Sequence, residues 1–426
     1  MKNTFAKLIL AVLFAAGLSA TAVAQFTLSG EYRPRSEFRH GYKTLPATDQ
    51  AAAFFIDQRT RLNFNYKTKG YRFFIGFQDV RVWGAQKQLV VNDGATTTLH
   101  QAFAEVYFND NFSLKAGRQE IIYDDHRIFG NVGWAQQARS HDAAIFRYMA
   151  NGWKADLGLA FNQNQAGLAG THYTYSSYKT FQYLHLNKAW DKVNMSILAL
   201  NNGVQVKDAL GAPIDGVHYT QTVGTYLGIK TGKLMTHLSL YYQGGQMADS
   251  IGTKLNAHLL GLDLAYKASD NFTVIGGFER QSGNSQVEAS EERTAFTPFY
   301  GTNHKFNGFM DYFYVGNHSQ SVGLQDAYLK LKYKKGKFNA GVDVHYFLAA
   351  ADVSDGKGGV ADPALGTEID TYLGTKLAEG VGFKLGYSHM LPTETMQLLK
   401  GGDLNETANW AYMMLVIKPV FFTTAK

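Results

Sequence analysis

The chain has 426 residues, with 41 lysines and arginines against 35 aspartates and glutamates, and a formal net charge of +6. This charge excess is too small to predict nucleic-acid binding, and the absence of cysteine excludes a disulfide framework and thiol chemistry. A soluble chain of this length would be expected to form two or more domains. No linker or change in composition divides the sequence, which favours one large domain.

The first 24 residues have the features of a secretory signal peptide. Two lysines precede an apolar stretch at residues 8–18, and small residues form a cleavage site before Gln25. The apolar stretch is shorter than the ~20 residues that a membrane-spanning helix needs. We expect residues 1–24 to be removed and residues 25–426 to form a single outer-membrane domain with both termini in the periplasm.

The mature chain alternates polar and apolar residues over segments of about 10 residues. In residues 26–39, for example, Glu31, Arg33, Arg35 and Glu37 share one face. A strand points successive side chains to opposite faces, and such segments throughout a secreted chain are typical of a barrel with an apolar outside and a polar lumen. The sequence therefore predicts an all-β fold, a transmembrane antiparallel β-barrel in the outer membrane.

Short turn signals alternate strictly with longer polar stretches along the chain, which predicts about 18 strands and a monomeric channel with an aqueous lumen. A soluble multi-domain β protein would leave this alternation unexplained. The short turns are at residues 67–70, 109–111, 151–152, 191–192, 231–233, 269–271, 335–337 and 378–380. The longer stretches are at residues 40–53, 85–96, 122–138, 164–175, 204–216, 246–252, 284–320, 351–364 and 391–406.

Arginines on the first two strands are predicted to line the lumen. Arg33 and Arg35 share the polar face of the first strand, and Arg59 and Arg61 share that of the second. An arginine on the lipid face at mid-membrane costs ~2–4 kcal/mol, so we expect all four to point inward. Two interpretations remain open: ion pairs with acids of the same strands that stiffen the wall, or a track of surplus positive charge that selects an anionic solute.

Residues 115–148 form the most distinctive segment. Strict alternation places Arg118 in phase with Leu114, on the lipid face. The sequence therefore predicts a β-bulge that turns Arg118 towards the lumen, with a position at the rim as the alternative. Arg127 and Arg139 flank the loop that follows, and they are further candidates to face the solute.

This segment resembles the alginate export family of outer-membrane porins, because "GRQ" closes a strand, an Asp-rich turn follows, and Arg139 precedes Asp142 by three residues. Residues 300–317, "YGTNHKFNGFMDYFYVGN", are similar to a second element of that family, and "EYRPRSEFR…DQRTRLNFNY…FQDVRVWG" matches its arginine-rich start.

The resemblance implies an 18-stranded monomeric channel with an electropositive lumen that passes anionic polysaccharide or acidic sugars, with periplasmic export components as candidate partners. The chain departs from the alginate exporter in having only short turns on the periplasmic side, which leaves a general anionic-sugar or small-solute porin equally open. The matching solute-facing positions are Arg33, Arg35, Arg59, Arg61, Arg118 and Arg139.

The longest loop, residues 284–320, is predicted to fold into the pore and narrow it. Loops of this length in a compact fold are usually functional or disordered, and its many aromatic residues argue against disorder. The alternative is a cap at the outer mouth that does not touch the solute. The predicted constriction residues are His304, Lys305, Phe306, Phe309, Asp311 and Tyr312.

No metal, cofactor or enzymatic activity is expected. The thirteen histidines form no metalloprotease motif or tight cluster with other ligands. Ser140-His141-Asp142 invites comparison with lipid hydrolases built on barrels, but neighbours on a strand point to opposite faces. Three classes remain: an anion-preferring porin, a general or hydrophobic-solute porin, and a barrel enzyme. The expected partners are outer-membrane lipid and an anionic sugar or polysaccharide, and not nucleic acid.

Overall fold

The computed structural model describes residues 24–89, 97–171, 173–175, 177–208, 210–249, 251–318 and 321–424. The signal peptide predicted at residues 1–24 lies outside this part of the chain, apart from Ala24. The first strands are β1 (Gln25–His40), β2 (Ala53–Lys67), β3 (Tyr71–Val82), β4 (Thr97–Tyr107), β5 (Phe112–Gln119), β6 (His141–Ala150), β7 (Trp153–Phe161), β8 (Thr180–Ala189), β9 (Val193–Lys207) and β10 (Pro213–Thr231). The remaining elements are β11 (Leu234–Gln246), β12 (Lys254–Lys267), β13 (Phe272–Gln281), β14 (Glu292–Arg293), η1 (Asn303–Lys305), α2 (Val315–His318), β15 (Leu324–Lys335), β16 (Phe338–Leu348), β17 (Ala364–Ala378), β18 (Val381–Pro392), α3 (Glu394–Lys400), β19 (Ala408–Ile417) and β20 (Val420–Thr423).

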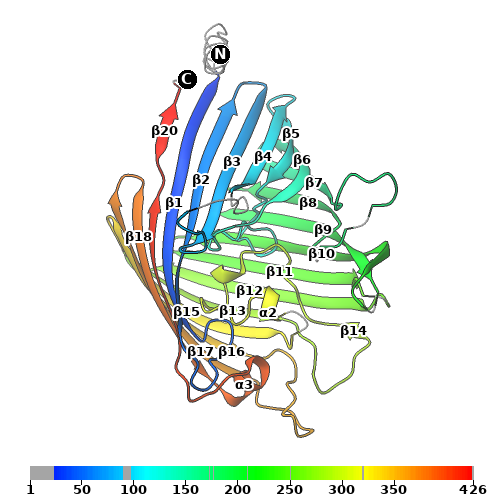
Figure 1. Ribbon diagram of the computed structural model, residues 1–426, viewed down its shortest axis with the longest axis vertical. Coiled ribbons are helices and arrows are strands. Elements are labelled where there is room, and N and C mark those ends of the chain that lie inside the picture. Colours follow the sequence, from blue (N-terminus) through cyan, green and yellow to red (C-terminus); the bar gives the residue numbers. More distant parts are fainter. Residues whose placement is uncertain are drawn as a thin grey trace.

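Eighteen of the strands in the described residues form a closed antiparallel barrel (Figure 1). Each barrel strand pairs with the next, and β1 pairs with β19 to close the ring. The two remaining strands are additions: β14 lies parallel to the edge of β12, and β20 extends the pairing along β1. The predicted 18-stranded all-β barrel is confirmed.

The connections also follow the prediction. All eight predicted short turns join strands at one end of the barrel, and the described parts of the predicted longer loops lie at the other. Residues 90–96 of the predicted stretch 85–96 lie outside the described residues. At the short-turn end the backbone N–H of Phe26 donates to the hydroxyl of Thr424 at 2.9 Å. This bond joins the first barrel strand to the C-terminal part of the chain. Among the described residues, none of the helices has the length and apolar character needed to cross a membrane.

The two faces of the strands differ as the alternation requires. In β15, Leu329 and Leu331 are exposed on the outer surface, whereas Asp326, Tyr328 and Lys330 line the inside. The apolar outer face is the surface that lipid would cover. The polar inner face is therefore where a functional site belongs.

Two loops fold back into the barrel and fill much of its interior (Figure 1). We call residues 120–140, between β5 and β6, the first inner loop, and residues 282–323, between β13 and β15, the second inner loop. The second includes the predicted inward loop, residues 284–320. The predicted inward fold of this loop is confirmed: the backbone N–H of Met310 donates to the Glu368 carboxylate of β17 at 2.7 Å.

Apolar packing on opposite walls holds the inner loops. On one wall, the rings of Phe129 and Tyr300 lie 5.3 Å apart and pack with Phe181 of β8. On the other, Met310 and Tyr312 of the second inner loop belong to a buried cluster with side chains of β15 to β19. Burying such side chains stabilises the folded loops by ~1.5–3 kcal/mol each.

Candidate functional site

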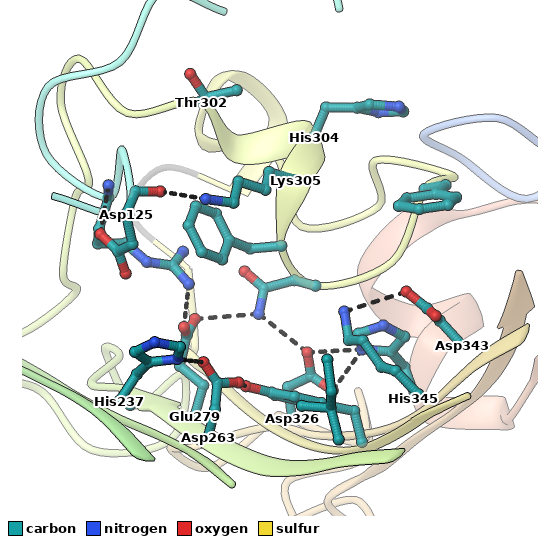
Figure 2. Close-up of a pocket in the computed structure, with 18 of the residues that line it drawn as sticks. Asp125, His237, Asp263, Glu279, Thr302, His304, Lys305, Asp326, Asp343 and His345 are labelled. Carbon is teal, nitrogen blue, oxygen red and sulfur yellow. Dashed lines mark hydrogen bonds and ion pairs between the residues drawn. The ribbon is translucent and has the colours of Figure 1, made fainter. Parts of the chain in front are cut away.

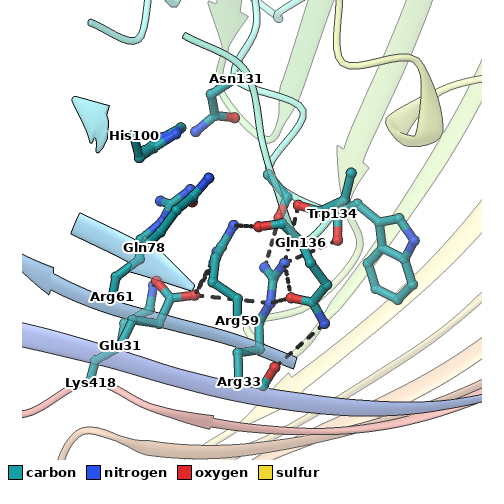
Figure 3. Close-up of polar contacts among 12 residues, drawn as sticks. Glu31, Arg33, Arg59, Arg61, Gln78, His100, Asn131, Trp134, Gln136 and Lys418 are labelled. Carbon is teal, nitrogen blue, oxygen red and sulfur yellow. Dashed lines mark hydrogen bonds and ion pairs between the residues drawn. The ribbon is translucent and has the colours of Figure 1, made fainter. Parts of the chain in front are cut away.

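The arginines of β1 and β2 face inward as predicted, but they bind the first inner loop (Figure 3). Arg33 donates to the carbonyl oxygen of Gly133 at 2.7 Å and to the side chain of Gln136 at 2.8 Å. Arg59 donates to the carbonyl oxygen of Gln136 at 3.2 Å. Arg33 and Arg59 are cross-strand partners, so two adjacent guanidinium groups hold one loop segment.

Acids of the same strands pair with these arginines. Arg35 contacts Glu37 and Asp57 at 2.7 Å each, and Arg59 contacts Glu31 at 2.5 Å. Charge-assisted pairs of this kind are among the stronger hydrogen bonds in proteins. The geometry therefore fits the interpretation of an ion-pair network that stiffens the wall and anchors a loop.

Arg61 takes part in the same network. Its Nε donates to Gln78 at 3.1 Å, and one terminal nitrogen lies 3.7 Å from Glu120 of the first inner loop. The predicted lumen-facing position of Arg61 is found, with its contacts directed to the wall and the loop.

The predicted bulge at Arg118 is wrong. The register of β5 with β4 and β6 is unbroken across it, so alternation places Arg118 on the opposite face from the buried Gln119. Arg118 pairs with Asp142 at 2.8 Å, and both side chains are about half exposed. Its position next to the end of β5 fits the alternative of a rim residue, and its charge is satisfied there by Asp142.

Arg127 and Lys305 connect the two inner loops to each other and to the wall; Figure 2 shows Lys305 directed to Asp125. Arg127 is buried, pairs with Glu279 of β13 and lies over the ring of Phe306. The ammonium group of Lys305 donates to the carbonyl oxygen of Asp125 at 2.7 Å, and burial lowers the pKa of Lys305. Both residues line the same cavity, described below.

The tip of the second inner loop docks on acids of the wall. The side-chain amide of Asn307 donates to Glu279 and to Asp326, at 3.1 Å each (Figure 2). Asn307 and Gly308 both have positive φ angles, which turn the chain so that it meets the wall.

Backbone donors continue this contact along β17. The N–H of Phe309 donates to Asp370 at 3.2 Å, and that of Met310 donates to Glu368 at 2.7 Å. Both carboxyl groups are fully buried. Buried carboxyl groups need such partners, so these acids of the wall serve to position the loop.

Between the inner loops and the strands from β10 to β19 lies a cavity of about 640 Å³, which we call the central chamber (Figure 2). Rings from both loops and the wall line it, including Trp134, Phe309 and Tyr372. Its acidic lining residues are Asp124, Asp125, Asp263, Glu279, Asp326 and Asp343, and its lysines are Lys305, Lys330, Lys332 and Lys384.

The charges of the chamber differ in whether they are partnered. Each acid has a polar or charged partner. The pairs are Asp124 with His185, Asp125 with Ser239, Asp263 with Tyr328, Glu279 with Arg127, Asp326 with His345, and Asp343 with Lys330. Lys332 and Lys384 have no hydrogen bond or ion pair with the described part of the chain, and both are exposed within the lumen. A solute in the chamber therefore meets two free ammonium groups.

A second cavity, of about 470 Å³, continues towards the short-turn end and shares Asn339 and Lys384 with the chamber. Four lysines line it, including the shared Lys384, and Glu31 is the one acid there among the described residues. Its other basic residues are Arg33, Lys337, Lys376 and Lys418. The passage thus becomes more basic beyond the chamber.

The predicted constriction residues divide into two groups. His304, Lys305, Phe306 and Phe309 line the central chamber, as expected for a narrowing loop. Asp311 and Tyr312 do not line it. Asp311 accepts from Tyr42 and lies 2.9 Å from His304, while the fully buried Tyr312 donates to the carbonyl oxygen of Gly41.

Asp311 and Tyr312 therefore hold the loop in place and are not part of the passage. Burial alone would raise the pKa of Asp311, but the contacts with His304 and Tyr42 outweigh burial and lower it. Asp311 is thus held in its ionised form within the loop.

The Ser140-His141 pair does not form, because His141 contacts the hydroxyl of Tyr178 at 3.0 Å. Instead the hydroxyl of Ser140 lies 3.1 Å from Nδ1 of His100, whose Nε2 lies 2.7 Å from Glu120. This order resembles a hydrolytic triad, but the Ser140 hydroxyl makes a closer contact, of 2.5 Å, with the carbonyl oxygen of His100. Its proton is directed to that carbonyl, so the geometry suits a structural chain of hydrogen bonds.

No family model matches the chain, and no curated protein matches it in sequence. Solved outer-membrane proteins do match it in structure. OpdK of Pseudomonas aeruginosa is 11% identical with a TM-score of 0.61, over 93% of this chain and 99% of that one. OccK9 (OpdG) of the same organism is 11% identical with a TM-score of 0.62, over 93% and 98%.

A BenF-like porin from Pseudomonas fluorescens Pf-5 is 12% identical with a TM-score of 0.62, over 93% and 99% of the two chains. A structure of OpdK with vanillate matches at a TM-score of 0.59, with 10% identity over 94% and 99%. These identities show the fold, that of an outer-membrane porin. The predicted membership of the alginate export family is wrong, because the structural matches are these porins and no family model supports that assignment.

Proposed function

We propose that this protein is a monomeric outer-membrane channel through which small solutes that carry a carboxylate, including aromatic ones, diffuse, and that the central chamber selects them. The observation that carries the proposal is the contrast within the chamber: every lining acid has a partner, whereas Lys332 and Lys384 do not. A carboxylate would provide the missing partner for these ammonium groups.

The size of the passage supports a small solute. The chamber volume of about 640 Å³ falls within the range of small-molecule sites, ~300–1,000 Å³. Aromatic rings in its lining, including Trp134 and Tyr372, offer a face for a ring of the solute. A neutral apolar solute would desolvate the lysines without replacing their hydrogen bonds to water, which disfavours the hydrophobic-solute alternative.

The fold and the arrangement of charge suggest the orientation and the route. In outer-membrane barrels the long loops face outward and the short turns face the periplasm. A solute would then pass the inner loops, enter the chamber and leave along the lysines at the short-turn end. Weak, successive contacts of this kind allow passage, because each must release the solute to the next. The structural similarity to OpdK, solved with vanillate, a small aromatic carboxylate, is consistent with this solute class.

The proposal can be tested by changing the two free lysines together. We expect the double variant Lys332→Gln/Lys384→Gln to shift the reversal potential under a salt gradient towards cations and to reduce benzoate permeation several-fold in a liposome-swelling assay. Permeation of a neutral sugar such as arabinose should change much less. The control Lys267→Gln/Lys335→Gln removes the same charge from positions outside the chamber. An unchanged reversal potential and unchanged benzoate permeation would refute selection by the chamber and leave a general porin.

A further inference from the structure

A cavity of about 560 Å³ lies apart from the central chamber, and its lining residues include the end of β5 and the start of β6, at the long-loop end of these strands. We call it the outer cavity. Its lining comes from the ends of β5 and of the first inner loop, the start of β6, four residues between β7 and β8 (Asn162, Tyr173, Ser177 and Tyr178), β9 and the second inner loop. It shares no lining residue with the central chamber. It is therefore a distinct place at which a solute could be held.

Arg139 gives the outer cavity an unsatisfied positive charge. Its guanidinium group donates to the carbonyl oxygen of Gly301 at 3.1 Å, and no carboxylate of the described residues lies within ion-pair distance. By contrast Arg118, in the same lining, is paired with Asp142. Burial lowers the pKa of Arg139, which reflects the cost of removing its charge from water. A guanidinium group has five donors in a planar fork, so most remain for an anion.

Aromatic rings line the same cavity as Arg139. Tyr178 and Tyr300 both line the outer cavity, with ring centres 5.2 Å apart in an edge-to-face arrangement. The hydroxyl of Tyr178 contacts His141 at 3.0 Å, and that of Tyr300 donates to Asn202. These bonds fix the rings before any ligand arrives, and aromatic rings favour stacked or edge-to-face contact with another ring.

The backbone at Arg139 is held by hydrogen bonds of Arg139 itself and of the next residue. The backbone N–H of Arg139 donates to the carbonyl oxygen of Asn131 at 2.8 Å. The next residue, Ser140, is held by the hydrogen bonds to His100 described above. A cation with so few partners and so well fixed a backbone is suited to bind an anion with little reorganisation.

We propose that the outer cavity is a second binding site of the channel, which takes up an aromatic carboxylate before it reaches the central chamber. Arg139 binds the carboxylate through its guanidinium fork, and the rings of Tyr178 and Tyr300 flank the aromatic ring. The direction of passage rests on the proposed function, whereas binding in the outer cavity does not. Two sites in series would raise the local concentration of the solute at the entrance while leaving its release to the lysines of the chamber.

Binding can be measured without transport, by titrating 4-hydroxybenzoate into the purified full-length barrel in detergent in a calorimeter. The background is Lys332→Gln/Lys384→Gln, so that binding in the central chamber is weakened. We expect Arg139→Gln to weaken the remaining binding at least tenfold, Arg139→Lys to weaken it less, and the neutral analogue 4-hydroxybenzyl alcohol to bind at least tenfold more weakly. Arg81→Gln, a matched change of an arginine outside the cavity, should have no effect.

Because Arg139 also holds Gly301, a second variant is needed that leaves that bond intact. Tyr173→Leu removes a ring from the cavity lining on an exposed loop and should weaken binding of 4-hydroxybenzoate several-fold. Equal affinity of the background protein, Arg139→Gln and Tyr173→Leu would overturn the site, as would equal binding of the neutral analogue. Loss of binding in Arg139→Gln together with unselective permeation would support the site and refute the proposed function. Unchanged binding in Arg139→Gln together with selective permeation would refute the site in the outer cavity and support the proposed function.

Discussion

The Nη1 atom of Arg35 donates a hydrogen bond to the carbonyl oxygen of Trp134 at 2.8 Å, and the same guanidinium group lies 4.2 Å from the centre of the Trp134 ring. A side chain of the first strand thus fixes a loop that the chain reaches about a hundred residues later. Since Trp134 lines the central chamber, the width of the passage depends on a residue of the wall behind it.

Replacing Arg33 and Arg35 by alanine should release the first inner loop and raise single-channel conductance, with more current noise. The loop would lose the bonds to Gly133 and Trp134, and each bond to a charged group is worth ~1.5–3 kcal/mol. Arg72→Ala is the control, because Arg72 bonds Asn65 of the neighbouring strand and not an inner loop. An unaltered conductance in a folded double variant would contradict the role of these arginines as loop anchors.

Gly308→Ala should displace the tip of the second inner loop and widen the chamber. A Cβ atom at this position would lie 2.5 Å from the Glu368 carboxylate, and the φ angle of 81° already disfavours a side chain. Gly356→Ala is a matched control, because its φ angle is 72° but its Cβ would meet nothing within 4 Å. In planar bilayers we expect higher conductance for Gly308→Ala alone. Equal conductance of the two variants would mean that the contact with Glu368 does not set the position of the loop.

Asp311 should stabilise the protein in a pH-dependent way. Because contacts with His304 and Tyr42 lower its pKa, its contribution is fully present above its unfolded-state pKa of ~4 and is lost as pH falls through the lower folded-state value. The difference in unfolding free energy between the wild type and Asp311→Asn should therefore be constant from about pH 5 to 7 and shrink below about pH 4. Denaturant unfolding of detergent-refolded protein at several pH values measures it. If the difference in unfolding free energy between the two proteins grew as the pH fell, folding would raise the pKa of Asp311 and not lower it.

Arg118 and Arg147 should differ in their effect on stability. Arg118 and Asp142 are both about half exposed, so Arg118→Ala should cost at most ~1 kcal/mol. Arg147 makes two bonds of 2.8 Å to Asp156, which is fully buried, so Arg147→Ala should cost ~3 kcal/mol by leaving that carboxylate without its cation. Unfolding in denaturant compares the two, and equal losses would contradict the assignment of Arg118 to the rim.

Most of the fold could be predicted because the pattern that specifies a barrel is local. Alternation and turn residues lie within a few positions of each other, so the turn at residues 67–70 and the strand number followed from the sequence. The inward direction of Arg33 and Arg59 followed from the cost of a charge in lipid. The bulge at Arg118 was wrong because strict alternation held there, and Asp142 on the neighbouring strand, not a change of face, satisfied the charge.

Less of the site could be predicted from the sequence, because the site depends on which charged side chains already have hydrogen-bond or ion-pair partners in the folded protein. Nothing in the sequence shows that Arg33 binds the carbonyl oxygen of Gly133, a hundred residues away. Lys332 and Lys384 did carry a signal, since both lie on the inward phase of their strands. Their lack of partners, which makes them candidates, appears only when the loops are in place.

The pairing of β1 with β19 has a consequence for the order of assembly. The ring cannot close until the last strand of the chain is available, and pairing between segments this distant in sequence is slow because loop closure must precede it. The first inner loop is held by β1, whereas the second is held by β17, and these two strands become near neighbours in the wall only when β19 pairs with β1. We therefore expect the inner loops to dock, and the passage to narrow, only after the ring has closed.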